Sequence, residues 1–355
     1  MDLTDQATTI REGEELDPQK IESFLRDTIP DLNGEMTLKQ FPSGHSNLTY
    51  LVTVGSREMV LRRPPFGYKA KTAHDMGREY RILSAIHAVY PYAPRPLAFS
   101  EDESIIGCPF YVMQKISGII LRRDLPSGLE FSSDQLCRLF ERLVEVLHEL
   151  HSIDYKRIGL ENFGKPSGYV LRQVTGWNKR YRAARTPDVP GCEDIMGWLE
   201  EKMPPETDRP GIIHNDFKFD NVVLDPDDPM NVIGVLDWEM ATLGDPLMDL
   251  GCSLGYWVEK TDPPEQQAIR YMPTHLAGAM TRKDMVNYYA SLSGLRMDHF
   301  DFYRCFGLFR LAVIVQQIYY RYYHGQTKDE RFKLMSYAVA VLDRTAREVI
   351  EKSDL

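Results

Sequence analysis

The pattern of hydrophobic and polar positions changes at about residue 120. Before that point, stretches with strand character alternate with helical spacing, which predicts strands over 36–41, 48–54, 58–61 and 108–115 and helices over 17–29 and 72–88. Gly55-Ser56 joins the second and third strands as a hairpin turn. Thr72, with Asp75 three residues later, is the expected start of the second helix.

Beyond residue 120 helical spacing dominates. Ser132-Ser133-Asp134 opens one helix, and further helices are predicted over 169–186, 192–202, 246–257, 282–292, 299–323 and 329–351. The pattern therefore predicts an α+β chain with a small N-lobe of sheet and helix over 1–116 and a larger helical C-lobe over 117–355. A cleft between two such lobes is where a small-molecule site is expected.

Composition narrows the class of protein. The chain has 355 residues and a net charge of −10, which argues against nucleic-acid and anionic-membrane partners, since both need a basic surface. The acidity either favours a cationic substrate or only keeps the protein in solution. Five scattered cysteines without a CxxC pair, and an acidic N-terminal stretch without an apolar core, predict a cytoplasmic protein with reduced thiols. The sequence leaves the oligomeric state open.

One island in the helical part, residues 211–237, has the pattern of short strands around a polar turn. Residues 221–224 and 232–236 have strand character, and the five residues from Asp225 to Pro229 form a turn signal. In an antiparallel hairpin the start of the first strand lies beside the end of the second. The hairpin is therefore expected to bring Asn221 and Asp237 together as oxygen ligands of Mg²⁺.

Asp216 lies five residues before Asn221, in the spacing H-x-D-x-x-x-x-N that begins at His214. In kinase catalytic loops of this spacing the Asp accepts the hydroxyl proton and the Asn holds a metal ion. Phosphoryl transfer also needs cations that neutralise developing charge, and Lys218 can supply one. We therefore predict Asp216 as the catalytic base, Lys218 as a second catalytic residue and His214 as a residue that orients the loop. The alternative is that the two aspartates, 216 and 237, are turn residues.

The stretch HNDFKFDNVVLDPDDPMNVIGVLDWEMATLGDPLMDLG resembles the aminoglycoside phosphotransferase and choline kinase-like superfamily, and most of all the branch that occurs fused to certain acyl-CoA dehydrogenases. The pieces SGHSNLTY (43–50), MVLRRPP (59–65), REYRIL (78–83) and PFYVMQKISG (109–118) fit the same branch. The resemblance spans about 36–255. It implies a bilobal protein-kinase-like fold, with ATP and Mg²⁺ as cofactors.

By the same resemblance, residues 113–116 form the hinge that binds adenine, which selects Met113, Gln114 and Ile116. The loop over the phosphates is expected at 43–49, with Ser46 and Asn47 as contacts. This loop lacks G-x-G-x-x-G, so a Ser/Asn-rich hairpin turn is the alternative.

Arg62 stands where kinases place a lysine on the third strand to contact the α and β phosphates. Arginine is also cationic, but its planar fork reaches differently. Glu79 lies on the apolar face of its helix and needs a partner there, so we expect an Arg62–Glu79 pair; the alternative is a solvated Glu79. Asp245, as a helix N-cap before Pro246, and Asp249 are expected to be structural.

Two rival functions remain at this stage. A protein kinase is disfavoured because a helix start follows Asp237 within a few residues and no A-P-E motif occurs. A catalytically weak nucleotide-binding protein is suggested by Arg62 and the glycine-poor loop. The acceptor is open among aminoglycosides, choline, sugars and hydroxylated acyl-CoA. Segment 169–186 has five basic and no acidic residues, so Arg172 and Arg180 are predicted to bind an anionic acceptor, unless this is a solvated basic helix.

Overall fold

The computed structural model describes residues 3–42, 47–67 and 75–355. By its internal contacts the chain forms two compact units. Unit 1 comprises Met1–Ile120, Lys156–Leu160 and Val222–Ala241; unit 2 comprises Leu121–Tyr155, Glu161–Asn221 and Thr242–Leu355. The division expected from the sequence, at residues 116 and 117, is contiguous, whereas unit 1 also takes in two later segments.

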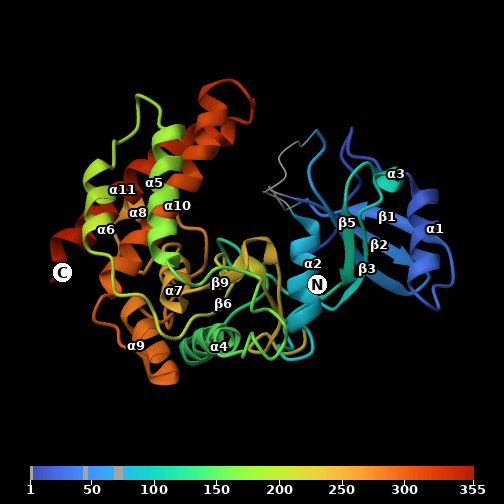
Figure 1. The fold of residues 1–355 in the computed structure, drawn as a ribbon, viewed down its shortest axis with the longest axis horizontal. Helices are drawn as coiled ribbons and strands as arrows, with labels where there is room; N and C mark the ends of the chain where they lie inside the picture. The colour runs from blue at the N-terminus through green and yellow to red at the C-terminus, as the bar shows by residue number, and fades with distance from the viewer. Residues whose placement is uncertain (1–2, 43–46, 68–74) are drawn as a thin grey trace. The chain divides into compact units, whose positions relative to one another are not determined.

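Unit 1 is built on a five-stranded antiparallel sheet of strand order β1-β2-β3-β5-β4 (Figure 1). Its strands are β1 (Met36–Gln40), β2 (Leu48–Val54), β3 (Arg57–Arg63), β4 (Pro96–Ser100) and β5 (Phe110–Gln114). The β2–β3 turn requires glycine at position 55, because this residue has φ +59° and an added Cβ would lie 2.3 Å from the Asn33 carbonyl oxygen. Strand β4 was not predicted; only one of its five residues is buried, so it lacks a strong apolar pattern.

Helices cover this sheet. Helix α1 (Pro18–Thr28) buries Ile21 and Leu25 in a cluster with strand residues, and the short α3 (Glu103–Ile106) contributes Ile106 to it. Helix α2 (Met76–Ile86) begins later than predicted, with Asp75 as its N-cap; residues 72–74 lie outside the described part of the chain. Its buried face includes Glu79 among Ile82, Leu83 and Ile86.

The predicted hairpin is present in unit 1. Strands β7 (Val222–Leu224) and β8 (Val232–Val235) pair antiparallel, with Val222 opposite Val235, and the 3₁₀ helix η2 (Trp238–Met240) follows. A further bridge joins Ile119 to Leu224. Gly118 permits this approach, since a Cβ there would lie 2.3 Å from the Leu224 carbonyl oxygen.

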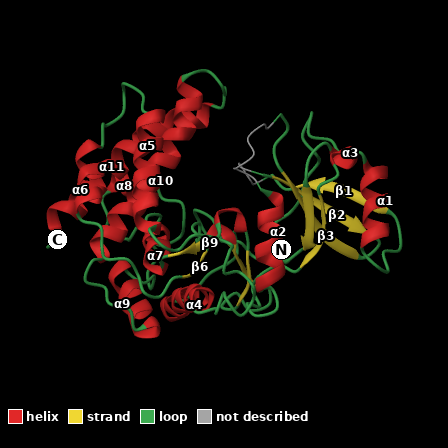
Figure 2. Cartoon of the chain, in the orientation of Figure 1, coloured by secondary structure: helices red, strands yellow, loops and turns green. Residues whose placement is uncertain are grey.

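Unit 2 is mainly helical (Figure 2). The predicted helices appear as α4 (Ser133–His151), α5 (Tyr169–Ala184), α6 (Glu193–Glu201), α7 (Pro246–Leu254), α9 (Arg282–Ser293), α10 (Phe300–Tyr323) and α11 (Met335–Lys352). Shorter elements were not predicted separately: β6 (Gly211–Ile213) pairs with β9 (Thr242–Gly244), and η1 (Phe219–Asn221), α8 (Pro264–Ala268) and η3 (Glu330–Leu334) complete the unit. The α+β fold class is thus confirmed, with an antiparallel sheet in the first unit and a larger helical second unit.

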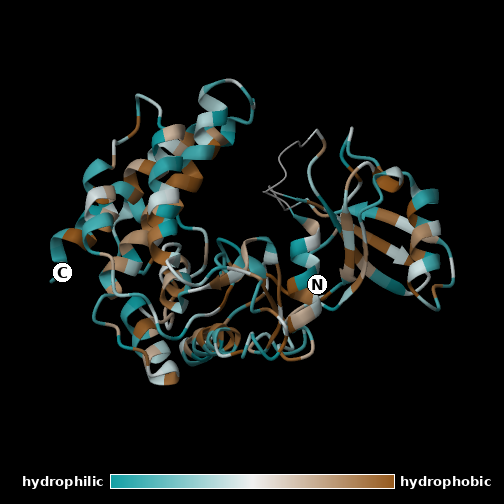
Figure 3. Cartoon of the chain, viewed as in Figure 1, coloured by the Kyte–Doolittle hydropathy of each residue, from teal (hydrophilic) through white to brown (hydrophobic). Residues whose placement is uncertain are grey.

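Helix α10 is the centre of unit 2. It packs against α5, α7 and α11, and α5, α10 and α11 lie side by side in Figure 1. Figure 3 shows apolar residues along α10, in keeping with its many buried positions. The crossing with α7 depends on Gly251 and Gly307, because a Cβ on either would lie 2.0–2.3 Å from a backbone oxygen of the other helix. Within the described residues, no helix is long and apolar enough to cross a membrane.

Candidate active site

Asp249, on α7, anchors the loop that begins at His214. Its Oδ2 accepts the backbone N–H of His214 at 2.6 Å, and its Oδ1 accepts that of Asn215 at 2.7 Å. The His151 ring Nε2 lies 3.1 Å from the same carboxylate. Burial acts to raise the pKa of Asp249, but the His151 contact and these donors outweigh it and hold the pKa below its usual range. Asp249 is therefore a buried, ionised carboxylate with a structural role, as expected.

The loop itself is shaped by two further contacts. Asn215 adopts a left-handed backbone (φ +65°), which Asn tolerates better than most residues, and its side chain accepts a hydrogen bond from the Tyr169 hydroxyl at 3.1 Å. The fully buried His214 accepts the Asp216 backbone N–H through Nδ1 at 3.3 Å. His214 thus orients the loop, as predicted, and does not itself point to catalysis.

The Asp216 carboxylate receives three side-chain donors. Lys218 Nζ lies 2.7 Å from Oδ2, and Asn221 Nδ2 lies 3.0 Å from the same oxygen. The Tyr256 hydroxyl donates to Oδ1 at 3.1 Å. Sequence reasoning missed Tyr256 because it lies forty residues further along the chain, just after α7, in no recognisable motif. The arrangement fixes the orientation of a carboxylate that still has a 17% exposed side chain.

Lys218 is a strongly held cation. Its ammonium also lies over the Tyr256 ring, 4.8 Å from the ring centre. Burial alone would lower the pKa of Lys218, but its interactions with Tyr256 and Asp216 outweigh burial and raise the pKa above its ordinary value. Lys218 is therefore charged at all physiological pH values.

Unit 1 contains the second group of predicted residues, gathered around Arg62. The Arg62 guanidinium lies 2.8 Å from Glu79 Oε1, 2.8 Å from Asp237 Oδ1 and 3.8 Å from Glu239 Oε2. The predicted Arg62–Glu79 pair is therefore confirmed, and Glu79 is not solvated. Asp237 has φ +67° where the hairpin gives way to η2. Three carboxylates thus surround one buried guanidinium, which leaves a net negative charge in the cluster.

The other predicted nucleotide-binding residues have mixed surroundings. Asn47 is 2% exposed and donates to Glu239 Oε2 at 2.7 Å, whereas Ser46 lies outside the described residues. Met113 pairs with Val60 within the sheet, and the Gln114 backbone N–H donates to the Arg95 carbonyl. A role of residues 113–116, including Ile116, in binding adenine stays a prediction.

The two predicted acceptor-binding arginines on α5 differ. Both outer nitrogens of Arg172 donate to backbone carbonyls, of Ser167 and Lys165, so this side chain holds the loop before its helix. Arg180 lies over the Trp177 ring, 4.5 Å from its centre, which agrees with the predicted neighbourhood of these two residues. A role of either arginine in binding an acceptor stays a prediction.

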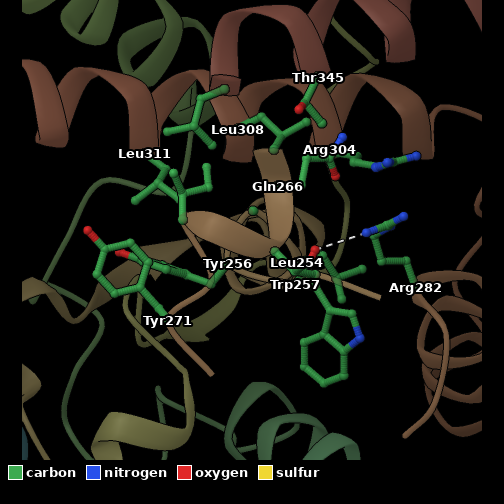
Figure 4. A pocket seen from close by; sticks show the side chains of 14 residues that line it. Leu254, Tyr256, Trp257, Gln266, Tyr271, Arg282, Arg304, Leu308, Leu311 and Thr345 are labelled. Carbon is green, nitrogen blue, oxygen red and sulfur yellow. Dashed lines mark hydrogen bonds between the residues drawn. The ribbon is translucent and has the colours of Figure 1, made fainter. Parts of the chain in front are cut away.

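A small pocket, partly open to solvent, lies in unit 2 (Figure 4). Its lining is mostly apolar and includes Leu254, Leu308 and Leu311. Figure 4 shows Tyr256 and Tyr271 on one side and Arg282 and Arg304 on the other. Because the Tyr256 hydroxyl also contacts Asp216, the pocket adjoins the surroundings of the candidate base.

The family model of the phosphotransferase enzyme family matches residues 37–277, well over half of the chain. The chain belongs to this family. The matched region includes both the Arg62 cluster and the loop around Asp216. The last 78 residues of the chain, which contain α10 and α11, lie outside the match.

Sequence relatives of this chain include acyl-CoA dehydrogenase family members. Mouse acyl-CoA dehydrogenase family member 10 is 36% identical over 309 residues, which cover 86% of this chain and 28% of that protein. The chain spans only about a quarter to a half of the length of such curated relatives.

Two solved structures are similar to this chain in fold. A candidate aminoglycoside phosphotransferase from Ralstonia eutropha is 28% identical, with a TM-score of 0.81, 96% of this chain covered and 100% of that one. Choline kinase from Cryptosporidium parvum is 13% identical, with a TM-score of 0.64 and 95% of each chain covered, which shows the shared kinase-like fold alone.

Proposed function

We propose that this protein transfers the γ-phosphoryl group of ATP, with Mg²⁺, to a hydroxyl group of a small molecule. The observation that carries the proposal is the Asp216 carboxylate, oriented by donors from Lys218, Asn221 and Tyr256. A carboxylate so held is suited to accept a proton from an approaching hydroxyl group.

The roles of the residues follow from their contacts. Asp216 accepts the acceptor's hydroxyl proton while the acceptor oxygen bonds to phosphorus and the bond to the ADP oxygen breaks. Lys218 and Tyr256 prevent the carboxylate from rotating away from that proton. Lys218 also provides positive charge close to the reacting oxygens, in a place where burial strengthens its field.

The residues proposed as metal ligands, Asn221 and Asp237, fit Mg²⁺ in their chemistry. Asn221 uses its amide nitrogen to contact Asp216, which leaves its oxygen as the atom that can ligate a cation. Asp237 belongs to a cluster with three carboxylates and one arginine, whose negative excess favours a cation. Bound Mg²⁺ would neutralise charge on the phosphates during transfer.

The nucleotide is proposed to contact unit 1 through Arg62, Asn47 and the segment 113–116. Arg62 has a planar fork that can contact phosphate as well as Glu79.

Reduced thiols are expected of a cytoplasmic enzyme, and all five cysteines of the chain are free, which supports a cytoplasmic location.

The test is a screen of hydroxyl-bearing metabolites for stimulated ADP release with Mg-ATP. Hydroxyacyl-CoA compounds, choline, sugars and kanamycin-type aminoglycosides represent the candidate acceptor classes. We expect one class to raise ADP release well above the rate of ATP hydrolysis in its absence, and Asp216→Asn to remove the increase. If Mg-ATP binds but no compound raises turnover, the protein is instead a nucleotide-binding module, the alternative suggested by Arg62.

A further inference from the structure

Two arginines of unit 2 lie against one tryptophan ring. The guanidinium of Arg180, on α5, is 4.5 Å from the centre of the Trp177 ring, and that of Arg310, on α10, is 5.2 Å from it. Two like charges at one ring repel each other, and a negative charge between them would offset this repulsion. Burial and then the charge of Arg310 lower the pKa of Arg180, in keeping with this repulsion.

Arg310 is the more unusual of the two, because it is only 3% exposed and its Nη1 atom is buried without a hydrogen-bond partner. A buried N–H donor that lacks a partner costs free energy. Arg282, a half-buried arginine of the same unit, is by contrast paired with carboxylates: it lies 2.6 Å from Asp262 and 3.2 Å from Glu259. The unsatisfied Nη1 therefore indicates a group that the protein keeps for a partner from outside.

The titratable groups that interact most strongly with Arg310 are Cys252, Tyr256, Asp216 and Tyr169. Burial raises the pKa of the Cys252 thiol to about 11 and raises those of the two tyrosines above the ordinary phenol value, so these three are neutral near pH 7. Asp216 is the carboxylate among the four, and Lys218 already lies 2.7 Å from it. Asp216, the one carboxylate among these four groups, is thus already paired with a cation.

We propose that Arg180 and Arg310 bind an oxyanion, a carboxylate or a phosphate, which the acceptor carries in addition to its reacting hydroxyl group. The inference rests on the proposed function, because it places this oxyanion on the molecule that Asp216 deprotonates. Guanidinium forks suit both kinds of oxyanion. Arg180 is exposed and meets the ligand from solvent, while Arg310 supplies the unsatisfied N–H and lies close enough to Asp216 for their charges to interact.

The first experiment measures binding to the full chain in the absence of nucleotide. The probes are 3-hydroxybutyrate, which carries a carboxylate, glycerol 3-phosphate, which carries a phosphate, and 1,3-butanediol, which is uncharged. We expect calorimetry to show binding of at least one anionic probe and not of the diol, and the better anion identifies the oxyanion. Arg310→Met and Arg180→Met should each weaken it by about tenfold or more, the usual worth of a charge-assisted hydrogen bond.

Two exposed arginines provide matched controls. Arg321 lies on α10, as Arg310 does, and Arg182 lies on α5, as Arg180 does; the control variants are Arg321→Met and Arg182→Met. Both should bind the anionic probes as the wild type does. If the controls weaken binding as much as Arg310→Met, general electrostatic attraction explains the effect and the proposed site is overturned.

Stability separates a binding role of Arg310 from a structural one. Because Arg310→Met removes a buried cation with an unsatisfied N–H, we expect the melting temperature of the ligand-free protein to stay the same or to rise. If Arg310 were structural, Arg310→Met would instead lower the melting temperature. A large fall in the melting temperature of Arg310→Met, together with wild-type affinity of Arg180→Met for the anionic probes, would overturn the proposal. Arg310→Lys, which keeps the charge and loses the fork, should show an intermediate affinity.

ADP release distinguishes failure of this site from failure of the proposed function. If the wild type phosphorylates an uncharged alcohol, and Arg180→Met and Arg310→Met do so equally well, the oxyanion site is wrong and the phosphotransferase stands. If the anionic probes bind through both arginines but no hydroxyl compound releases ADP from Mg-ATP, the proposed function is wrong, and the oxyanion no longer belongs to an acceptor.

Discussion

Arg62 joins two carboxylates that are far apart in the sequence: its Nη1 lies 2.8 Å from Glu79 and its Nη2 lies 2.8 Å from Asp237. The proposed Mg²⁺ ligand Asp237 is therefore already in contact with a cation of the protein, which it shares with two other carboxylates. Metal binding at Asp237 must share or replace this contact. Because an arginine has two outer nitrogens, it can release Asp237 and still keep Glu79.

Removal of Arg62 should affect both stability and nucleotide affinity. Arg62→Ala leaves Glu79 buried without its cation, which should lower the free energy of unfolding by about 3–5 kcal/mol. It should also raise the KM for ATP, while Arg62→Lys restores part of both. Chemical denaturation and steady-state kinetics measure the two effects. In the Arg62→Ala/Glu79→Gln double variant the loss of stability should be smaller than in Arg62→Ala; an equal or larger loss would argue against the paired charge as its cause.

Loss of the proposed base should act on turnover alone. Asp216→Asn keeps the size of the side chain, so fold and Mg-ATP binding should persist while kcat falls by about 10²–10⁴. Asp227→Asn, in the exposed turn between β7 and β8, is the control and should turn over normally. Retention of more than half of the wild-type kcat by Asp216→Asn, with the true acceptor, would remove Asp216 from this role.

Removal of the Asp237 carboxylate should reduce the dependence of ATP binding on Mg²⁺. Asp237→Ala should weaken the binding of Mg-ATP or abolish turnover, because it removes the proposed carboxylate ligand. Calorimetric titration of ATP at several Mg²⁺ concentrations measures this directly. Identical Mg²⁺ dependence in the wild type and the variant would contradict the assignment.

Tyr256 is predicted to be a positioning residue. Tyr256→Phe removes the hydroxyl that donates to Asp216 Oδ1 and keeps the ring beneath Lys218. We expect kcat to fall by about tenfold, in line with the loss of one hydrogen bond to a charged group, while the KM for ATP stays unchanged. A parallel rise in the KM for ATP, without a change in kcat, would place Tyr256 in nucleotide binding instead.

Asp249 should make stability sensitive to acid. Its pKa in the folded protein lies below the usual value, so its contribution is fully present above that value, about pH 4, and is lost as pH falls further towards the folded-state pKa. Asp249→Asn puts an amide against backbone donors and should cost about 3 kcal/mol at pH 7. Between pH 3 and 7, the free energy of unfolding should fall less steeply with decreasing pH in the variant than in the wild type. An equally steep fall in both proteins would exclude Asp249 as the cause of the acid sensitivity.

The sequence predicted those parts of the site that are close together along the chain. The spacing from His214 to Asn221 and the hairpin that follows are local patterns, and the Arg62–Glu79 pair follows from a carboxylate on an apolar helix face. Tyr256 and Arg310 could not be found in this way, since only the packing of the helices brings Tyr256 to Asp216 and Arg310 to Trp177. The turn at Gly55-Ser56 was predictable from local chemistry, while β4 was not, because it is weakly apolar.

The membership of Val222–Ala241 in unit 1 has a consequence for synthesis on the ribosome. The chain emerges from its N-terminus, so the first 120 residues are complete long before the hairpin exists. At about 5–20 residues per second, the delay is on the order of ten seconds. During this time Ile119 lacks its bridge to Leu224, and Arg62 has Glu79 but neither Asp237 nor Glu239. Unit 1, whose translation begins first, is thus completed only after much of unit 2 has been translated.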